Sequence, residues 1–176
     1  MSDDNTRYLI DTSVFIQAQR TYYAFNLCPG FWESLVWLHK QGRVFSLDKV
    51  MEEICDGEED DLVNWAKKSM PSKCFLACDD PEVIGWYAKM QLWANSEPQF
   101  SPAAKAEFAS AADAWLVAYA KAKNLTVVTQ EVFSANVRWR IPIPNVCKAK
   151  DFTVPCVDIY TMLQALDVKF EWAAKK

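Results

Sequence analysis

The chain has 176 residues, a length that suits one domain with a substantial core and is short for two. Hydrophobic residues make up 51% and charged residues 24%, as in ordinary globular proteins, and the formal net charge of −4 argues against a general nucleic-acid coat. No apolar stretch approaches the roughly 20 residues that span a bilayer, and the polar residues 1–5 lack a secretory pattern, so we expect a cytoplasmic protein.

The first half of the chain alternates strand and helix patterns, as a parallel sheet requires. Gly42 is expected to end one of the helices, and Asp48 is a candidate cap for another. The expected elements are strands over 7–10, 43–47 and 74–77 and helices from residue 12 and over 31–40, 48–55 and 62–70.

The second half is expected to hold one long helix from Pro102 to Asn124, followed by a β-branched strand over 125–129. Pro142 and Pro144 are expected to exclude regular structure around them. The other expected elements are a helix from residue 81 to about 94, a fifth short strand over 145–147 and a last helix over 157–166. The predicted fold is therefore α/β, a single domain over 1–176 with a short parallel sheet of about four or five strands sandwiched by helices.

Six cysteines are spread along the chain with no C-x-x-C pair. Because no secretory pattern precedes them, we expect reduced thiols rather than a disulfide framework. With one His in the chain, a structural zinc site is not expected either.

Acidic residues occur where several of the predicted elements begin or end. Asp11 closes the apolar strand, Glu53 lies in the first turns of the helix after the second strand, and Glu131 follows the fourth strand. The helical rise from Asp113 to Asn124 is roughly 16 Å, close to the length that the returning strand covers, which brings Asp113 beside Glu131. All four acids can therefore reach one edge of the sheet, where α/β proteins bind ligands.

Each of these acids also has an ordinary structural interpretation. Asp11 could cap the helix that follows it, and Asp113 could be a single satisfied acid on its helix. Asp113, however, stands among apolar neighbours, where an unpaired charge is costly. Acids that meet at such a level repel one another unless a cation neutralises them, so the pattern favours a divalent metal site.

The chain resembles PIN-domain nucleases, metal-dependent ribonucleases that include VapC-type toxins of toxin–antitoxin pairs. The resemblance rests on Ile-Asp-Thr-Ser at 10–13, Val-x-x-Glu-Ile at 50–54, Ala-Ala-Asp-Ala at 111–114 and Val-Val-Thr-x-Glu at 127–131, in that order along nearly the whole chain. The segment 143–147 resembles a little-characterised bacterial PIN-like subgroup. The resemblance implies a PIN-like fold, an RNA substrate and an antitoxin partner, and it leaves a homodimer open.

The resemblance also implies the site residues. Asp11 and Asp113 fall on the principal metal positions, Glu53 and Glu131 on positions that bind the metal or a water, and Ser13 on the small polar position beside the first acid. Glu131 departs from the commoner Asp. Glu52 is a rival to Glu53, although it lies about 100° around the helix. Such a site suits Mg²⁺ or Mn²⁺, which activates a water to attack the phosphodiester, so no side chain has to act as a nucleophile.

Three arginines are candidates for contacts with RNA phosphates, and other functions stay open. Arg138 and Arg140 flank Trp139 shortly after Glu131, and Arg20 is a weaker candidate. The aromatic residues of 22–25 and 31–32 could stack unpaired bases, although a core role suits them better. The alternatives are a non-catalytic PIN-like interaction protein and a DNA-directed nuclease. A phosphotransfer domain does not fit, because Ser13 stands where a phosphatase would need a second acid.

Overall fold

A computed structural model describes residues 5–172 and contains one five-stranded sheet of order β3-β2-β1-β4-β5. Every strand pair in it is parallel. The strands are β1 (Tyr8–Ile10), β2 (Val44–Leu47), β3 (Phe75–Leu76), β4 (Thr126–Val128) and β5 (Cys156–Val157). The predicted fold class, an α/β fold with a short parallel sheet flanked by helices, is therefore confirmed.

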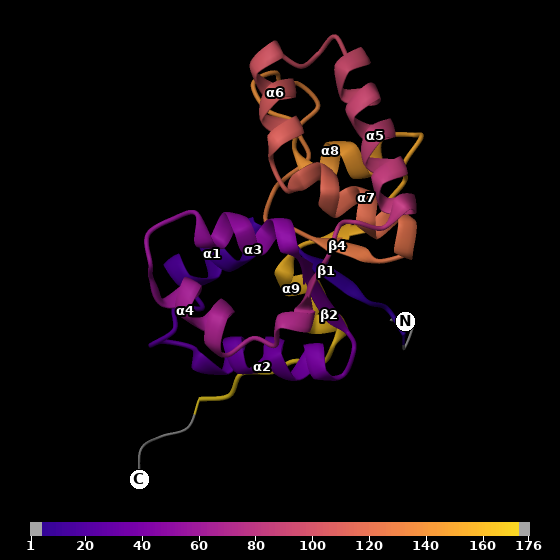
Figure 1. Ribbon diagram of the computed structural model, residues 1–176. Helices are drawn as coiled ribbons and strands as arrows, with labels where there is room; N and C mark the ends of the chain where they lie inside the picture. The colour runs from indigo at the N-terminus through magenta and orange to yellow at the C-terminus, as the bar shows by residue number, and fades with distance from the viewer. Residues whose placement is uncertain (1–4, 173–176) are drawn as a thin grey trace.

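Helices cover both faces of this sheet. In Figure 1, α5 to α8 gather on one side of the sheet and α2 lies on the opposite side. Tyr160 of α9 contacts Tyr23, which precedes α2, so α9 packs on the side of α2. The helices are α1 (Thr12–Arg20), α2 (Pro29–Lys40), α3 (Asp48–Cys55), α4 (Asp61–Lys68), α5 (Pro81–Ser96), α6 (Pro102–Ser110), α7 (Asp113–Lys123), α8 (Ile143–Lys148) and α9 (Ile159–Ala165), with a short 3₁₀ turn at Ser72–Cys74.

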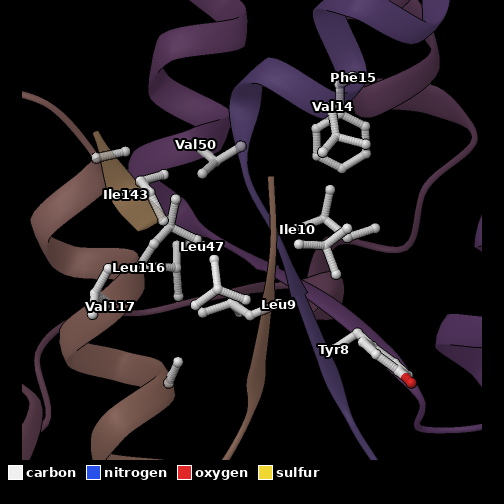
Figure 2. Close-up of a cluster of buried hydrophobic side chains, with 14 of the residues drawn as sticks. Tyr8, Leu9, Ile10, Val14, Phe15, Leu47, Val50, Leu116, Val117 and Ile143 are labelled. Carbon is white, nitrogen blue, oxygen red and sulfur yellow. The ribbon is translucent and has the colours of Figure 1, made fainter. Parts of the chain in front are cut away.

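The central strand β1 is buried on both faces, as expected for a parallel sheet. Figure 2 shows Leu9 on the side of Leu116 and Val117, whereas Ile10 lies toward Val14 and Phe15. This alternation follows from the two-residue period of a strand. Because β1 ends at Ile10, Asp11 lies at the carboxyl edge of the sheet.

The predicted long helix over 102–124 is wrong, because the structure has two helices there. α6 ends at Ser110, Ala111 is extended with ψ 164°, and α7 begins at Asp113. Alanine favours helix, so local propensity does not explain the break. The Ala112 N–H instead donates a 2.8 Å hydrogen bond to the Glu53 carboxylate, and this long-range contact fixes the start of α7. Asn124, which is left-handed at φ 53°, ends α7 as predicted.

The predictions for the segment after β4 also need correction. Residues 145–147 belong to α8 rather than to a strand, and the fifth strand is β5, where the last helix had been expected to begin. Pro144 lies in the first turn of α8, where a missing N–H costs nothing because that N–H would have no partner within the helix. Asp48 is the first residue of α3 rather than its cap, which is Leu47.

The remaining observations concern membranes and thiols. None of the helices within residues 5–172 combines the length and the apolar character needed to cross a bilayer. All six cysteines are free thiols in the structure. The first four residues, which are part of the polar start noted above, lie outside the described residues.

Candidate functional site

The site begins where β1 and β4 end side by side. Ile10 is paired with Val128, so the next residues of the two strands, Asp11 and Thr129, face one another at the carboxyl edge of the sheet. The Asp11 N–H donates to the Val128 carbonyl at 2.9 Å, which continues the strand pairing by one residue. The register of two buried strands therefore places the first acid of the site.

Asp11 is buried, and its carboxylate is held by hydroxyl groups. The residue is only 3% exposed. The Ser13 hydroxyl donates to Oδ2, and the Thr129 hydroxyl donates to the same oxygen at 2.9 Å. Asp11 occupies the cap position of α1, but its side chain makes no capping hydrogen bond. The alternative of a simple helix cap therefore does not describe this carboxylate.

The Ser13 and Thr129 hydroxyls also anchor the segment after β4. The Gln130 N–H donates to the Ser13 hydroxyl at 3.2 Å, and the Glu131 N–H donates to the Thr129 hydroxyl at 3.1 Å. The same two hydroxyls thus orient Asp11 and fix the backbone that carries Glu131.

Glu53 reaches the site from α3, and its neighbour Glu52 does not. One Glu53 oxygen accepts from the Thr12 hydroxyl, and the other accepts the Ala112 N–H at the start of α7. Glu52 is exposed and pairs with Lys49 at 3.1 Å. Glu53 is therefore the acid of this pair that joins α1, α3 and α7.

Glu131 is held by a cation and by a backbone donor. Arg140 lies 2.8 Å from Oε1, and the Ile143 N–H donates to Oε2 at 2.7 Å. Arg140 was predicted to contact substrate phosphates, but in the structure its guanidinium pairs with this acid. The pair closes the loop between β4 and α8 onto the edge of the sheet.

Asp113 differs from the other three acids in that its carboxylate accepts no hydrogen bond within the described residues. It is the first residue of α7 and is half-buried. It lines a pocket of about 40 Å³ together with Glu131 and Arg140, which is space for about one water.

Burial and mutual repulsion raise the pKa values of Asp11 and Asp113. The pKa of Asp11 is raised from 3.8 to about 6, chiefly by desolvation and also by repulsion from Glu131 and Glu53, while the Ser13 and Thr129 hydrogen bonds oppose the rise. Desolvation raises the pKa of Asp113 well above its usual range, and the charges of Asp11, Glu131 and Glu53 raise it further. The charges of Glu53 and Glu131 therefore lie close enough to Asp11 and Asp113 to disfavour the ionised form of those two acids.

The donor set fits a hard divalent cation in its chemistry. The candidate ligands are all carboxylate oxygens, which Mg²⁺ and Mn²⁺ prefer, and the two acids with raised pKa values would be stabilised by a positive charge. Within residues 5–172, no group of three His, Cys, Asp or Glu side chains is arranged as a ready-made metal cage. Mg²⁺ is usually held by one or two carboxylates together with waters and substrate phosphates. Two carboxylates, those of Asp11 and Asp113, are therefore enough protein ligands for this ion.

An open groove runs beside the acids along the β4–α8 loop. Its volume is about 850 Å³, and two residues of the acidic site, Ser13 and Glu131, line it. Arg138 and Arg140 line it, whereas Arg20 does not and lies instead near Asp60. The other lining residues are Gln17, Gln130, Val132, Ser134, Asn136, Val137, Trp139 and Pro142.

Comparison with known protein families assigns the chain to one of them. A family model described as "Domain of unknown function (DUF4411)" matches residues 8–170, a span that covers all five strands and all four acids. The chain belongs to this family. A search among curated proteins gave no match.

Some residues of the DUF4411 site were not predicted from the sequence. Thr12 and Thr129 support Glu53 and Asp11, and the Ala112 N–H fixes Glu53. Thr129 was detectable in principle, because it follows the fourth strand at the position that Asp11 holds after the first. The contact of Ala112 depends on a helix break that no local pattern signals.

Proposed function

We propose that this DUF4411 protein is a metal-dependent endoribonuclease that hydrolyses phosphodiester bonds with Mg²⁺ or Mn²⁺. One observation carries the proposal: four acids from separate elements meet at the carboxyl edge of a parallel sheet, and the two at the centre have raised pKa values. Clustered carboxylates of this kind destabilise the folded protein, and such clusters are more common at functional sites than elsewhere. Each of these acids belongs to one of the four sequence motifs that resemble those of PIN-domain nucleases.

The proposal gives each acid a role that its contacts allow. Asp11 and Asp113 would hold the ion, since within residues 5–172 no basic side chain lies at salt-bridge distance from either carboxylate. Glu53 and Glu131 would complete the negative field or position a water. Bound there, Mg²⁺ or Mn²⁺ would supply Lewis-acid activation of a water and stabilise charge on the phosphate.

The supporting residues keep this arrangement rigid. Ser13 and Thr129 hold one oxygen of Asp11, which leaves the other oxygen available. Thr12 and the Ala112 N–H hold both oxygens of Glu53 at the start of α7. Arg140 keeps Glu131 oriented in the lining of the groove.

A titration with Mn²⁺ tests the proposal directly. The purified protein is incubated with a structured RNA, an unstructured RNA and a DNA strand of the same sequence, and cleavage is followed on gels. We expect RNA cleavage that requires Mn²⁺ or Mg²⁺, stops with EDTA and is lost in Asp11→Asn. Unchanged cleavage by Asp11→Asn and Asp113→Asn would overturn the proposal, and preferential cleavage of DNA would reassign its substrate.

We further propose that the enzyme acts in the cytoplasm as the toxin of a toxin–antitoxin pair. This rests on the resemblance to VapC-type toxins. Induced expression should then arrest growth, the Asp11→Asn variant should not, and co-expression of the antitoxin partner should restore growth. Growth that continues normally with an active nuclease would remove the toxin role and leave the nuclease activity standing.

A further inference from the structure

The wall of the groove presents a large aromatic side chain to solvent. Trp139 is 70% exposed although it lines the 850 Å³ groove, which Ser13 and Glu131 of the acidic site also line. Single exposed hydrophobic residues are common and need no explanation by themselves. What distinguishes Trp139 is its position, since Trp172, which is 88% exposed, does not line this groove.

Trp139 is connected to the acidic site through one neighbour. The Arg140 guanidinium carbon lies 5.4 Å from the centre of the Trp139 ring, within the range of a cation–π contact. The same guanidinium pairs with Glu131 at 2.8 Å. Arg140 therefore links the orientation of the indole to an acid of the site, and a large part of the ring surface stays open.

The rest of the groove suits a strand with a phosphate backbone. Arg138 is exposed on the same wall, so one cation of the groove is not paired with an acid at salt-bridge distance among the described residues. Gln17, Gln130 and Asn136 offer amide groups that hydrogen-bond to bases or phosphates. Proteins that bind single strands combine cations that contact the phosphate backbone with an aromatic platform for the bases. Arg138 and Trp139 supply one of each here.

We infer that Trp139 is the stacking platform for an unpaired base of a single-stranded RNA that lies in this groove, with Arg138 contacting its phosphate backbone. The inference deepens the proposed nuclease function, on which it rests, by naming the side chain that recognises an unpaired base. A duplex keeps its bases stacked on one another, so only an unpaired base offers a face to the indole. The groove thus selects single-stranded segments and delivers them to the acids.

Binding in the presence of EDTA tests this inference without cleavage. The probe is a fluorescently labelled 12-nucleotide RNA, used single-stranded and as a duplex with its complement. The proteins are the wild type, Trp139→Ala, Trp139→Phe and the matched control Trp172→Ala, which removes an exposed Trp outside the groove. We expect Trp139→Ala to weaken single-strand binding by about tenfold or more, since one stacked base contributes about that much.

The controls separate stacking from a general effect on the protein. Trp139→Phe should restore most of the affinity, Trp172→Ala should bind like the wild type, and duplex binding should be weak in all four proteins. Circular dichroism of Trp139→Ala should match the wild type, because an exposed side chain adds little to the fold. Unchanged single-strand affinity in Trp139→Ala, or no single-strand binding by the wild type, overturns the inference.

The outcome is distinguishable from failure of the nuclease proposal. If Trp139→Ala loses binding but the wild type never cleaves RNA with Mn²⁺, the single-strand site stands and the nuclease falls. If the wild type cleaves and Trp139→Ala binds and cleaves equally well, the nuclease stands and the stacking role falls.

Discussion

The acidic site and the groove beside it differ in how they are built. Asp11 follows a strand, Glu53 and Asp113 lie on helices, and Glu131 lies in the loop after β4. Three of the four acids are held by hydrogen bonds or an ion pair. The groove is formed mainly by the loop between β4 and α8, with Trp139 and Arg138 exposed on its wall. Rigid elements fix geometry while loops carry recognition, so the two regions are expected to separate chemistry from binding.

The difference extends to electrostatics. At the acidic site, burial and like charges raise the pKa values of Asp11 and Asp113, so the charge there is costly. In the groove, Arg138 stands in solvent, where screening makes each charge worth little. Substitutions at the acids should therefore have large effects on cleavage and on folding, and substitutions in the groove should have smaller effects on binding alone.

The largest effect is expected from Asp113→Asn. This change keeps the shape of the side chain and removes a charge that would hold the ion, so we expect cleavage to fall by roughly 1,000-fold, which corresponds to the several kcal/mol that metal ions contribute. Affinity for the single-stranded 12-mer in EDTA should stay within about threefold of the wild type, because stacking and phosphate contacts are unchanged. Cleavage rates under single-turnover conditions and binding titrations give the two numbers. A parallel loss of binding and cleavage would contradict the separation of the two regions.

The second prediction concerns stability and pH at Asp11. Its pKa is about 6 in the folded protein and near 3.8 in the unfolded chain, so the folded state holds the proton more tightly. The stabilisation from protonated Asp11 is complete below about pH 4 and is lost as the pH rises through 6, a change of about 3 kcal/mol. Asp11→Asn does not titrate, so its free energy of unfolding relative to the wild type should rise by about that amount between pH 4 and pH 7.

Urea denaturation in EDTA at pH 4, 5, 6 and 7 measures this difference. Arg138→Gln serves as the control from the groove, and its difference from the wild type should not depend on pH in this range. Mn²⁺ should narrow the gap between Asp11→Asn and the wild type at pH 7, because a ligand that binds the folded wild type stabilises it. A gap of the same size at every pH would show that Asp11 carries no electrostatic strain.

The third prediction uses the adjacent pair Glu53 and Glu52. Glu53→Gln weakens the acceptor of the Thr12 hydroxyl and the Ala112 N–H and removes a charge next to Asp113, so we expect cleavage to fall by roughly tenfold, as for residues that orient metal ligands. Glu52→Gln is the matched control, because it makes the same chemical change one residue away, at a side chain that pairs with Lys49 rather than with Thr12 or Ala112. Cleavage assays with Mn²⁺ compare the two variants. Equal effects of both substitutions would mean that net charge, rather than contact, decides the result.

The sequence predicted the first half of the chain better than the second. Local patterns located β1, β2 and α3, because apolar runs and a strand–helix alternation leave few choices of register. The parallel order then implied that Asp11 and Glu53 approach the same edge. Here local propensity and tertiary packing agree, and such agreement is what makes an element predictable.

The second half failed where a long-range contact overrides local preference. The chain breaks between α6 and α7 at two alanines because Glu53 binds the Ala112 N–H, a residue 59 positions away. Likewise, Pro144 is accepted in the first turn of α8, and the two-residue β5 is too short to produce a period. Trp139 and Arg140 lie in the loop before α8, so their roles required the structure.

The smallest effect is expected at Arg138, and it tests the groove from its weak side. Arg138→Gln removes one exposed cation, so affinity for the single-stranded RNA should fall by about threefold at moderate salt, and the slope of log affinity against log salt should decrease by about 0.7. Arg20→Gln is the matched control, since Arg20 is exposed on α1 but does not line the groove. Binding titrations at salt concentrations from about 50 to 200 mM give the affinity and the slope. A strand bound in the groove can contact Arg138 but not Arg20, although the two arginines carry the same charge. If Arg20→Gln lowers the slope as much as Arg138→Gln, the RNA does not bind along the groove.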